Sequence, residues 1–331
     1  MVDASITEQS NSNSAPLRQG EIRYLSLGLA AFVAIVTLSY WRSQPIDWMS
    51  FLNIYGAALG LLLIGIYLRT YKDAERFACI TVALAGYALF GVSMGIVFHI
   101  YMPRPEPVLD EFLLRFDHYF GYHWPDAVTW LARDYAWLGR ALSYVYVSSF
   151  AQLVLVIVML GAAGRAARLD MLLVTGMIGL FLTFVVWQLL PNFSMGIHYP
   201  IPSEAEQAIR LVTNTSYGQA LKEAALNGIP VISNETMLGV VAFPSYHTVM
   251  ACLTVWFAFR TVAFWPIVIL NIAMIPAIHI HGAHHILDFF GGVFVSFAAL
   301  SLAGVFLSAG QGLTRGPSSN SFNRHQSHRN T

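Results

Sequence analysis

Apolar residues along this chain are gathered into long blocks separated by short polar connections. The blocks are about 18 to 25 residues long, the length that a helix needs to cross the hydrocarbon core of a membrane. Apolar positions fill each block instead of recurring at the spacing of a surface helix, which indicates helices embedded in lipid. The pattern predicts about eight membrane-spanning helices, at residues 24–41, 49–68, 77–101, 141–162, 170–190, 243–261, 265–281 and 284–308.

The fold class that follows is all-α, a polytopic transmembrane helical bundle, because only helices or closed barrels satisfy every backbone polar group in lipid. One bundle over residues 23–309 accounts for all of the apolar blocks, so we expect a single transmembrane domain. The flanking segments 1–22 and 310–331 are polar and rich in Ser and Asn. Both are expected to be disordered tails.

Two connections, residues 102–140 and 191–242, are much longer than the others. The first mixes apolar and charged residues too finely to span a membrane, so we expect it to lie along the interface with its Trp and Tyr side chains at headgroup depth. Its aspartates, Asp110, Asp117 and Asp126, are interpreted most simply as a solvated face. Connections of this length in a compact bundle are usually functional.

Composition supports a membrane protein and excludes other classes. Of the 331 residues, 56% are hydrophobic and 11% are charged, and the mean hydropathy is +0.58. The formal net charge is zero, so the chain lacks the basic surface of a nucleic-acid binder. Cys79 and Cys252 lie within apolar blocks and are interpreted as packing residues.

Lys and Arg residues concentrate in one set of short connections, and the positive-inside rule places such connections in the cytoplasm. This set includes Arg69, Lys72, Arg76, Arg165 and Arg168. We therefore expect a multi-pass protein of the plasma membrane with both termini cytoplasmic and both long connections extracytoplasmic. The sequence does not indicate an oligomeric state.

Two predicted helix starts carry residues suited to catalysis. Pro244 and Ser245 are favourable helix-start residues, and His247 then falls in the first turn of the sixth predicted span. The eighth span opens with His284 and Asp288, four residues apart, so they are expected to share one helix face with the carboxylate orienting the imidazole.

The expected topology brings both helix starts to the extracytoplasmic surface, where free backbone N–H groups and two positive dipole ends favour an anion such as phosphate. Phosphoryl transfer requires positioning, charge stabilisation, a nucleophile and a proton donor for the leaving oxygen. An oriented histidine supplies the nucleophile, and a second histidine supplies the proton.

These residues resemble the type 2 phosphatidic acid phosphatases, and within them the branch that includes the inositol phosphorylceramide synthases. The family's Pro-Ser-x-His motif is matched by residues 244–247, and its His-x-x-x-Asp motif by His284 and Asp288, followed by Gly291 and Gly292. The resemblance implies that His284 is the nucleophile that forms a phosphohistidine, Asp288 its orienting partner, and His247 the general acid.

The likeness covers roughly residues 100–305, and the segment 105–125 is similar to bacterial members of the same branch. It implies a catalytic core at about residues 77–308, a bacterial inner membrane, and a substrate that is a lipid with a phosphate headgroup. It implies a lipid phosphatase or phosphotransferase, and of the two it favours a phosphotransferase that transfers a phosphoinositol-type headgroup. No cofactor and no metal are expected.

The chain departs from the family at its phosphate-binding cations. The Ser-Arg pair expected before the third motif is replaced by Ala277 and Ile278, and the first motif is matched only by Arg104 and Pro105, with Val97 in the lysine position. Another cation must therefore supply positive charge, with candidates Arg104, Arg140, Arg210, His281 and His285. Together with Ser245 and Tyr246, the residues Arg104, His281 and His285 form the predicted phosphate-binding set.

Other interpretations remain open at this stage. His284 and Asp288 could form a purely structural pair. His281, His284 and His285 also spell a His-x-x-His-His box, as in membrane di-iron desaturases and hydroxylases. A third class is a non-catalytic lipid carrier or a haem protein with histidine axial ligands.

Overall fold

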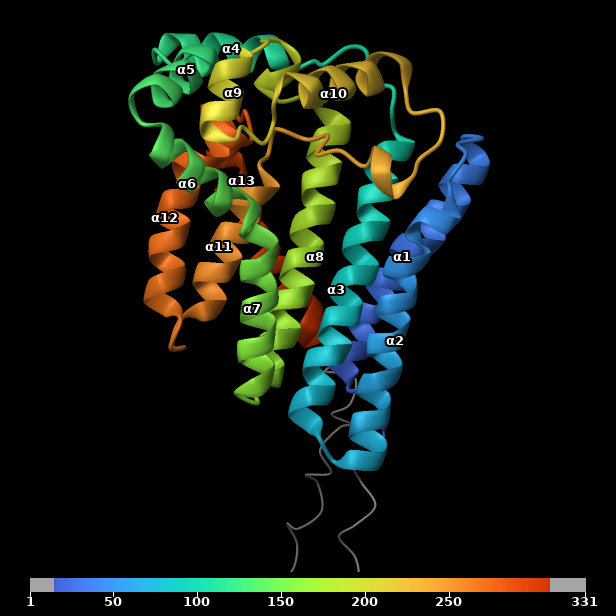
Figure 1. The fold of residues 1–331 in the computed structure, drawn as a ribbon. Helices are drawn as coiled ribbons and strands as arrows, with labels where there is room; N and C mark the ends of the chain where they lie inside the picture. The colour runs from blue at the N-terminus through green and yellow to red at the C-terminus, as the bar shows by residue number, and fades with distance from the viewer. Residues whose placement is uncertain (1–14, 310–331) are drawn as a thin grey trace, which may run out of the picture.

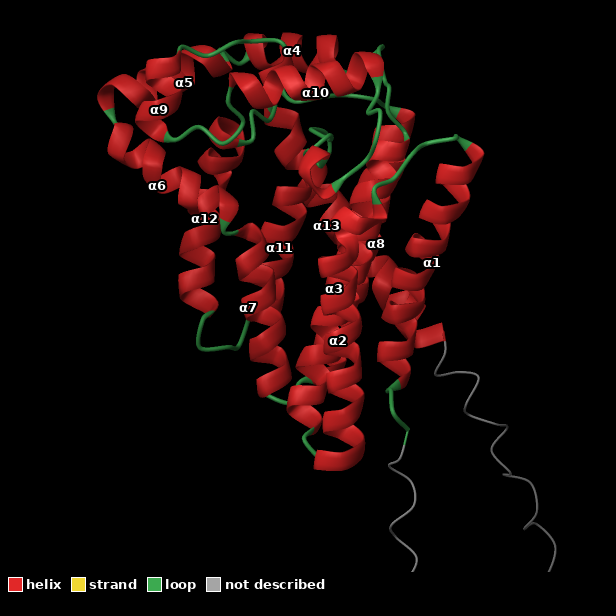
Figure 2. Cartoon of the chain, turned by 45° about the vertical axis from the view of Figure 1, so that its right-hand side comes forward, coloured by secondary structure: helices red, strands yellow, loops and turns green. Residues whose placement is uncertain are grey.

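The computed structural model describes residues 15–309, and within this range it contains thirteen α-helices and no β-strand (Figure 2). The longer helices run along the bundle (Figure 1). With the bent pair α6 and α7 taken as one, they form eight segments. Their bounds are α1 (Gln19–Trp41), α2 (Trp48–Lys72), α3 (Glu75–Ile100), α6 (Ala136–Val147) with α7 (Ser149–Ala162), α8 (Ala166–Leu189), α11 (Tyr246–Ala258), α12 (Phe264–His281) and α13 (Ile286–Ala309). The predicted polytopic helical bundle is therefore confirmed.

The eight segments are not eight uniform spans. Six of them, α1, α2, α3, α8, α12 and α13, are long and apolar enough to cross a membrane. The segment 141–162, predicted as one span, is built from α6 and α7, which meet at a bend of 49°. The segment 243–261, also predicted as a span, contains only the 13 residues of α11, which rise about 20 Å and fall short of a ~30 Å hydrocarbon core.

Short helices form a layer across one end of the bundle (Figure 1). They come from the two long connections and are α4 (Asp110–Tyr119), α5 (Trp124–Asp134), α9 (Ser203–Ile209) and α10 (Thr215–Asn227). The starts of α11 and α13 and the end of α12 lie beneath this layer (Figure 1). Both ends of the described chain lie at the opposite end of the bundle, as the predicted even number of crossings requires.

The predicted tails fall largely outside the described residues. This holds for residues 1–14 and for the whole segment 310–331. Helix α1 begins at Gln19, inside the range 1–22 that was expected to be a tail, and Glu21 within it is completely buried.

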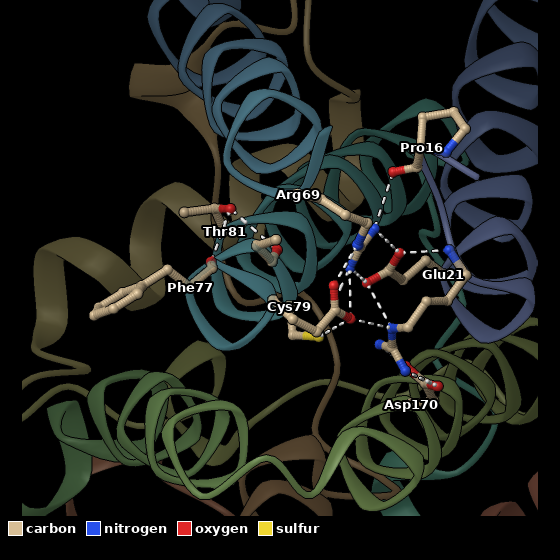
Figure 3. A network of polar contacts seen from close by, with 10 residues as sticks. Pro16, Glu21, Arg69, Phe77, Cys79, Thr81 and Asp170 are labelled. Atoms are coloured by element: carbon tan, nitrogen blue, oxygen red, sulfur yellow. Dashed lines mark hydrogen bonds and ion pairs between the residues drawn. The ribbon is translucent and has the colours of Figure 1, made fainter. Parts of the chain in front are cut away.

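A network of ion pairs joins the starts of α1, α3 and α8 to the end of α2 (Figure 3). Arg69 of α2 contacts Glu21 of α1 at 2.7 Å and Glu75 of α3 at 2.6 Å. Arg18 contacts Glu21 at 3.0 Å and Asp170 of α8 at 2.9 Å. Charges taken out of water need partners with good geometry, so the network specifies how the α1–α2 hairpin packs against α3 and α8.

Candidate active site

The start of α11 is held in place by a side-chain clamp. Asn192 accepts the backbone N–H of Phe243 at 2.6 Å and donates to the carbonyl of the same residue at 2.9 Å. Ser245 is the N-cap of α11, with its hydroxyl accepting the N–H of Thr248, as expected for a residue that satisfies an unpaired donor of the first turn. His247 therefore lies in the first turn, as predicted.

The start of α13 presents the second histidine in a different way from the one expected. His284 lies before the helix, which begins at Ile286, so His284 and Asp288 do not share a helix face. Asp288 lies in the first turn and reaches back, accepting the Nδ1–H of His284 at 2.9 Å and the backbone N–H of His285 at 2.8 Å. The predicted pairing of His284 with Asp288 is present, but as part of a helix cap.

The two starts bring both histidines together. The rings of His247 and His284 have centroids 6.3 Å apart and an interplanar angle of 66°, a separation at which one phosphate group can contact both. Because Nδ1 of His284 donates to Asp288, its Nε2 carries the lone pair, and the hydroxyl of Ser245 lies 3.5 Å from this nitrogen. Tyr146 of α6 stacks on the ring of His247 at 4.3 Å and 20°.

Two glycines after Asp288 allow the starts of α11 and α13 to approach closely. A Cβ atom on Gly292 would lie 2.5 Å from the carbonyl oxygen of Ser245, and one on Gly291 would lie 2.6 Å from the ring of Phe243. The backbone N–H of Ser245 also donates to the carbonyl of Asp288 at 3.0 Å. The distance between the two histidines thus depends on the absence of side chains at these two positions.

We expect Gly292→Ala to destabilise the protein by about 1–3 kcal/mol, the usual effect of overpacking, and to reduce turnover of a phosphate-bearing substrate, because α13 must move away from α11. Thermal unfolding in detergent and kcat measure the two effects. Gly304→Ala on the same helix is the matched control, since its Cβ would lie 3.8 Å from the nearest atom, in Met171. Equal behaviour of the two variants would contradict the close-approach argument.

The remaining predicted phosphate-binding residues are not gathered around this pair. Tyr246 donates its hydroxyl to the carbonyl of Gly176 in α8 at 3.2 Å. Arg104 donates to Gln188 and lies over the ring of Trp187. The other two arginine candidates are also engaged elsewhere, Arg140 with the carbonyl of Ala208 and Arg210 with the hydroxyl of Tyr144.

His281 is fully buried and bonded to backbone groups through both ring nitrogens. Nε2 lies 2.9 Å from the carbonyl of Gly139, and Nδ1 lies 3.4 Å from the backbone nitrogen of Val212. It joins α12 to the short-helix layer and presents no free nitrogen to a phosphate.

His285 bonds to a residue that was interpreted wrongly from the sequence. Its Nδ1 lies 2.6 Å from Oδ2 of Asp117 in α4, and Oδ1 of Asp117 accepts the backbone N–H of Ile286 at 3.0 Å. Asp117 and Asp110 were expected to form a solvated face, but both are buried, with exposed fractions of 1% and 3%. Burial lowers the pKa of His285, but the hydrogen bond to Asp117 and the nearby charges of Asp288 and Asp117 raise it, and the pKa lies above its ordinary value.

The α13 start is therefore not a free anion site, contrary to the expectation that both helix starts would offer unpaired N–H groups. The carboxylates of Asp117 and Asp288 already occupy the positive end of its dipole.

The geometry also weighs against the di-iron alternative. Each of the three histidines of the His-x-x-His-His box already has a protein partner. His281 bonds to the carbonyl of Gly139, His284 to Asp288, and His285 to Asp117. Within residues 15–309, no group of three or more His, Cys, Asp or Glu side chains is arranged to hold a metal ion.

An apolar cleft of about 420 Å³ has His247 among its lining residues. Residues of α3, α7, α8 and the segment 237–241 line it, among them Gly91, Gly95, Phe150 and Leu180. Its volume is within the ~300–1,000 Å³ of typical small-molecule sites. A second cavity, of about 350 Å³ between α11, α12 and α13, is lined by none of His247, His284 and Asp288.

Three residues that shape this region were not predicted to do so from the sequence, and these are Asn192, Tyr146 and Asp117. A signal was available for Asp117, because Asp110, Leu113 and Asp117 follow the i, i+3, i+7 spacing of one helix face and Leu113 is apolar. For Asn192 and Tyr146, contacts over 51 and 101 positions leave no local pattern.

Comparison with known proteins identifies the family. No curated protein and no solved structure matches the chain significantly. The family model described as the PAP2 superfamily matches residues 111–302, which is more than half of the 331 residues and contains both histidine motifs, and the chain therefore belongs to the PAP2 superfamily.

Proposed function

We propose that this protein is a membrane lipid phosphatase or phosphotransferase that acts through a phosphohistidine on His284. Family membership supports phosphatase-type chemistry on a lipid. The observation that carries the proposal is the orientation of His284. Its Nδ1 is held by Asp288, its Nε2 lies 3.5 Å from the hydroxyl of Ser245, and its ring centroid lies 6.3 Å from that of His247.

The reaction proceeds in two steps. Nε2 of His284 attacks the phosphorus atom and the bond from phosphorus to the leaving oxygen breaks, while His247 donates a proton to that oxygen. Asp288 stabilises the positive charge that develops on the His284 ring. In the second step an acceptor hydroxyl attacks the phosphohistidine, His247 takes its proton, and the N–P bond breaks.

The acceptor decides between hydrolysis and transfer. Water as acceptor gives a phosphatase, and a lipid or polyol hydroxyl gives a phosphotransferase. The resemblance of residues 100–305 to the inositol phosphorylceramide synthase branch favours transfer of a phosphoinositol-type headgroup. We propose that the reaction takes place on the extracytoplasmic side of the membrane.

The apolar cleft that His247 lines supports a lipid as the substrate. Its lining is apolar apart from a few groups such as His99, Thr183 and His247 itself. An acyl chain in this cleft would remove apolar surface from water and leave the headgroup beside His247.

We expect Gly91→Leu to reduce kcat/KM for a long-chain lipid phosphate by about 10-fold or more, because apolar pockets discriminate by roughly this factor when their volume changes. Gly91 lines the cleft, and a Cβ there would meet no atom within 4 Å, so the new side chain enters open space. Turnover of a short-chain, water-soluble phosphate monoester should change little. The control is Gly56→Leu on α2, where a Cβ also meets nothing within 4 Å but the position is outside the cleft. Equal losses on both substrates would contradict an acyl-chain site.

Trapping of the intermediate tests the proposal directly. Purified protein is mixed with ³²P-labelled lipid phosphates, with and without inositol-bearing donors and alcohol acceptors, and quenched in alkali. We expect labelled protein whose label is lost in acid, and a labelled lipid product when an acceptor is present. Release of free phosphate alone would favour the phosphatase, and the absence of both label and turnover over the whole panel would reject the proposed function.

A further inference from the structure

Asp117 connects the short-helix layer to the catalytic centre. It belongs to α4, is 1% exposed, and uses both carboxylate oxygens on the two residues that directly follow His284. One oxygen accepts Nδ1–H of His285 at 2.6 Å, and the other accepts the backbone N–H of Ile286 at 3.0 Å. Hydrogen bonds to a carboxylate are stronger than neutral ones.

The loop that carries His284 needs such external contacts. Ala283 is completely buried and has φ of +49°, in the left-handed region that costs a residue with a side chain about 1–2 kcal/mol. A backbone in this region persists only where its surroundings hold it. The carbonyl of Ala283 accepts the N–H of Met195 at 2.9 Å, and Asp288 and Asp117 hold the residues that follow.

The carboxylates of Asp288 and Asp117 bind different groups of this loop. Asp288 bonds the His284 ring and the N–H of His285, whereas Asp117 bonds the His285 ring and the N–H of Ile286. Without Asp117, the backbone N–H of Ile286 and Nδ1–H of the buried His285 ring would both lose their acceptor.

We propose that Asp117 is a positioning residue for the reaction, which through His285 and Ile286 fixes the start of α13 and thereby the direction of the His284 Nε2 lone pair. This inference rests on the proposed function. In this proposal α4, which belongs to the short-helix layer, supplies the contact to His285 and Ile286 that the spanning helices do not make.

The protonation state of His285 is coupled to this contact. The charged groups that act on the ring are Asp117 and Asp110 of α4 and Asp288 of α13, and these groups stabilise the imidazolium. With Asp117 replaced by a neutral side chain, that stabilisation is lost and His285 releases its proton at lower pH. A charged imidazolium donates a stronger hydrogen bond at position 117 than a neutral ring does, so the part of the alkaline limb of the kcat profile that follows His285 should move to lower pH.

The test compares Asp117→Asn with Asp110→Asn. Asp110 is a close structural match on the same helix, buried, bonded to the ring of His198 at 2.8 Å and to the N–H of Phe193 at 2.8 Å, but with no bond to residues 284–288. Both variants lose one His–carboxylate pair in which the carboxylate is buried. We expect Asp117→Asn to lower kcat by about 10- to 100-fold with little change in KM, as when a group that orients a functional histidine is removed, and to shift the alkaline limb. Asp110→Asn should lower the unfolding temperature by a similar amount and keep kcat. It should shift the alkaline limb less than Asp117→Asn does, because the charge of Asp110 acts on His285 less than the hydrogen bond and charge of Asp117 do.

Equal kcat losses in the two variants, or an unchanged pH profile in Asp117→Asn, would overturn the positioning role and reduce the contact to a structural one. Proton NMR of protein with ¹⁵N-labelled histidine gives a readout that does not depend on turnover. The short His285 Nδ1–H bond should produce a far-downfield proton in the wild type and in Asp110→Asn, and none in Asp117→Asn. A wild type that shows this proton but no turnover of any phosphate lipid would reject the proposed function, whereas an active wild type without it would reject the inference.

Discussion

Replacing His284 with alanine is expected to abolish phosphoryl transfer, with a fall in kcat of about 10⁴-fold or more, as for other enzymes that lose a covalent nucleophile. Asp288 activates Nε2 through its bond to Nδ1 of the same ring. Removing the ring therefore removes the nucleophile together with its activation. Both steady-state turnover and acid-labile protein phosphorylation should disappear, and the measurement is ³²P incorporation after alkaline quenching.

The control for this prediction is His123→Ala. His123 also pairs with a carboxylate on its own helix start, Asp126 at 2.9 Å, but the pair lies at the surface. Loss of an exposed ion pair costs about 0–1 kcal/mol, so this variant should keep its activity. Retention of phosphohistidine in His284→Ala would show that another residue is the nucleophile.

The local part of the site could be predicted from the sequence. Pro244 and Ser245 mark a helix start through their own conformational and hydrogen-bonding preferences, and His284 and Asp288 are close enough along the chain to meet in any helical turn. The prediction was wrong about the manner of contact, because Gly282 and Ala283 end the continuous helix before His284 and leave it in the loop.

The long-range part of the site could not be predicted. Asp117 and His285 are separated by 168 positions, and nothing in either local pattern indicates the other. A charged residue in an amphipathic surface helix is usually solvated, and this general rule favoured the wrong interpretation. Only the packing of α4 against the start of α13 turns Asp117 into a buried acceptor.

The spans show the same division between local and tertiary information. Hydropathy located the apolar segments correctly, because apolar composition is a property of each segment alone. It did not reveal the 49° bend between α6 and α7 or the shortness of α11, since both depend on neighbouring helices. The bend has a consequence for function, because it lies two residues after Tyr146, the residue that stacks on His247.

His247→Gln is expected to lower kcat for a lipid phosphate by about 10²- to 10⁴-fold, the usual contribution of a general acid or base. The size of the loss should depend on the leaving group. An alkoxide is a poor leaving group and requires a proton from His247, whereas p-nitrophenolate leaves without one. We therefore expect the first step with p-nitrophenyl phosphate to slow by no more than about 10-fold, measured as a burst of p-nitrophenol in rapid-mixing experiments.

The same variant should accumulate phosphohistidine. Without His247 the attacking hydroxyl has no base, so the N–P bond formed with the aryl substrate breaks slowly, and the labelled fraction of protein should exceed that of the wild type. His284→Ala, which removes the nucleophile, should lose turnover of the alkyl and the aryl substrate to the same extent and show no labelled protein. If His247→Gln reduced the alkyl and aryl reactions by the same factor, His247 would act by binding the phosphate between the two rings, 6.3 Å apart, and not by transferring a proton to the leaving oxygen.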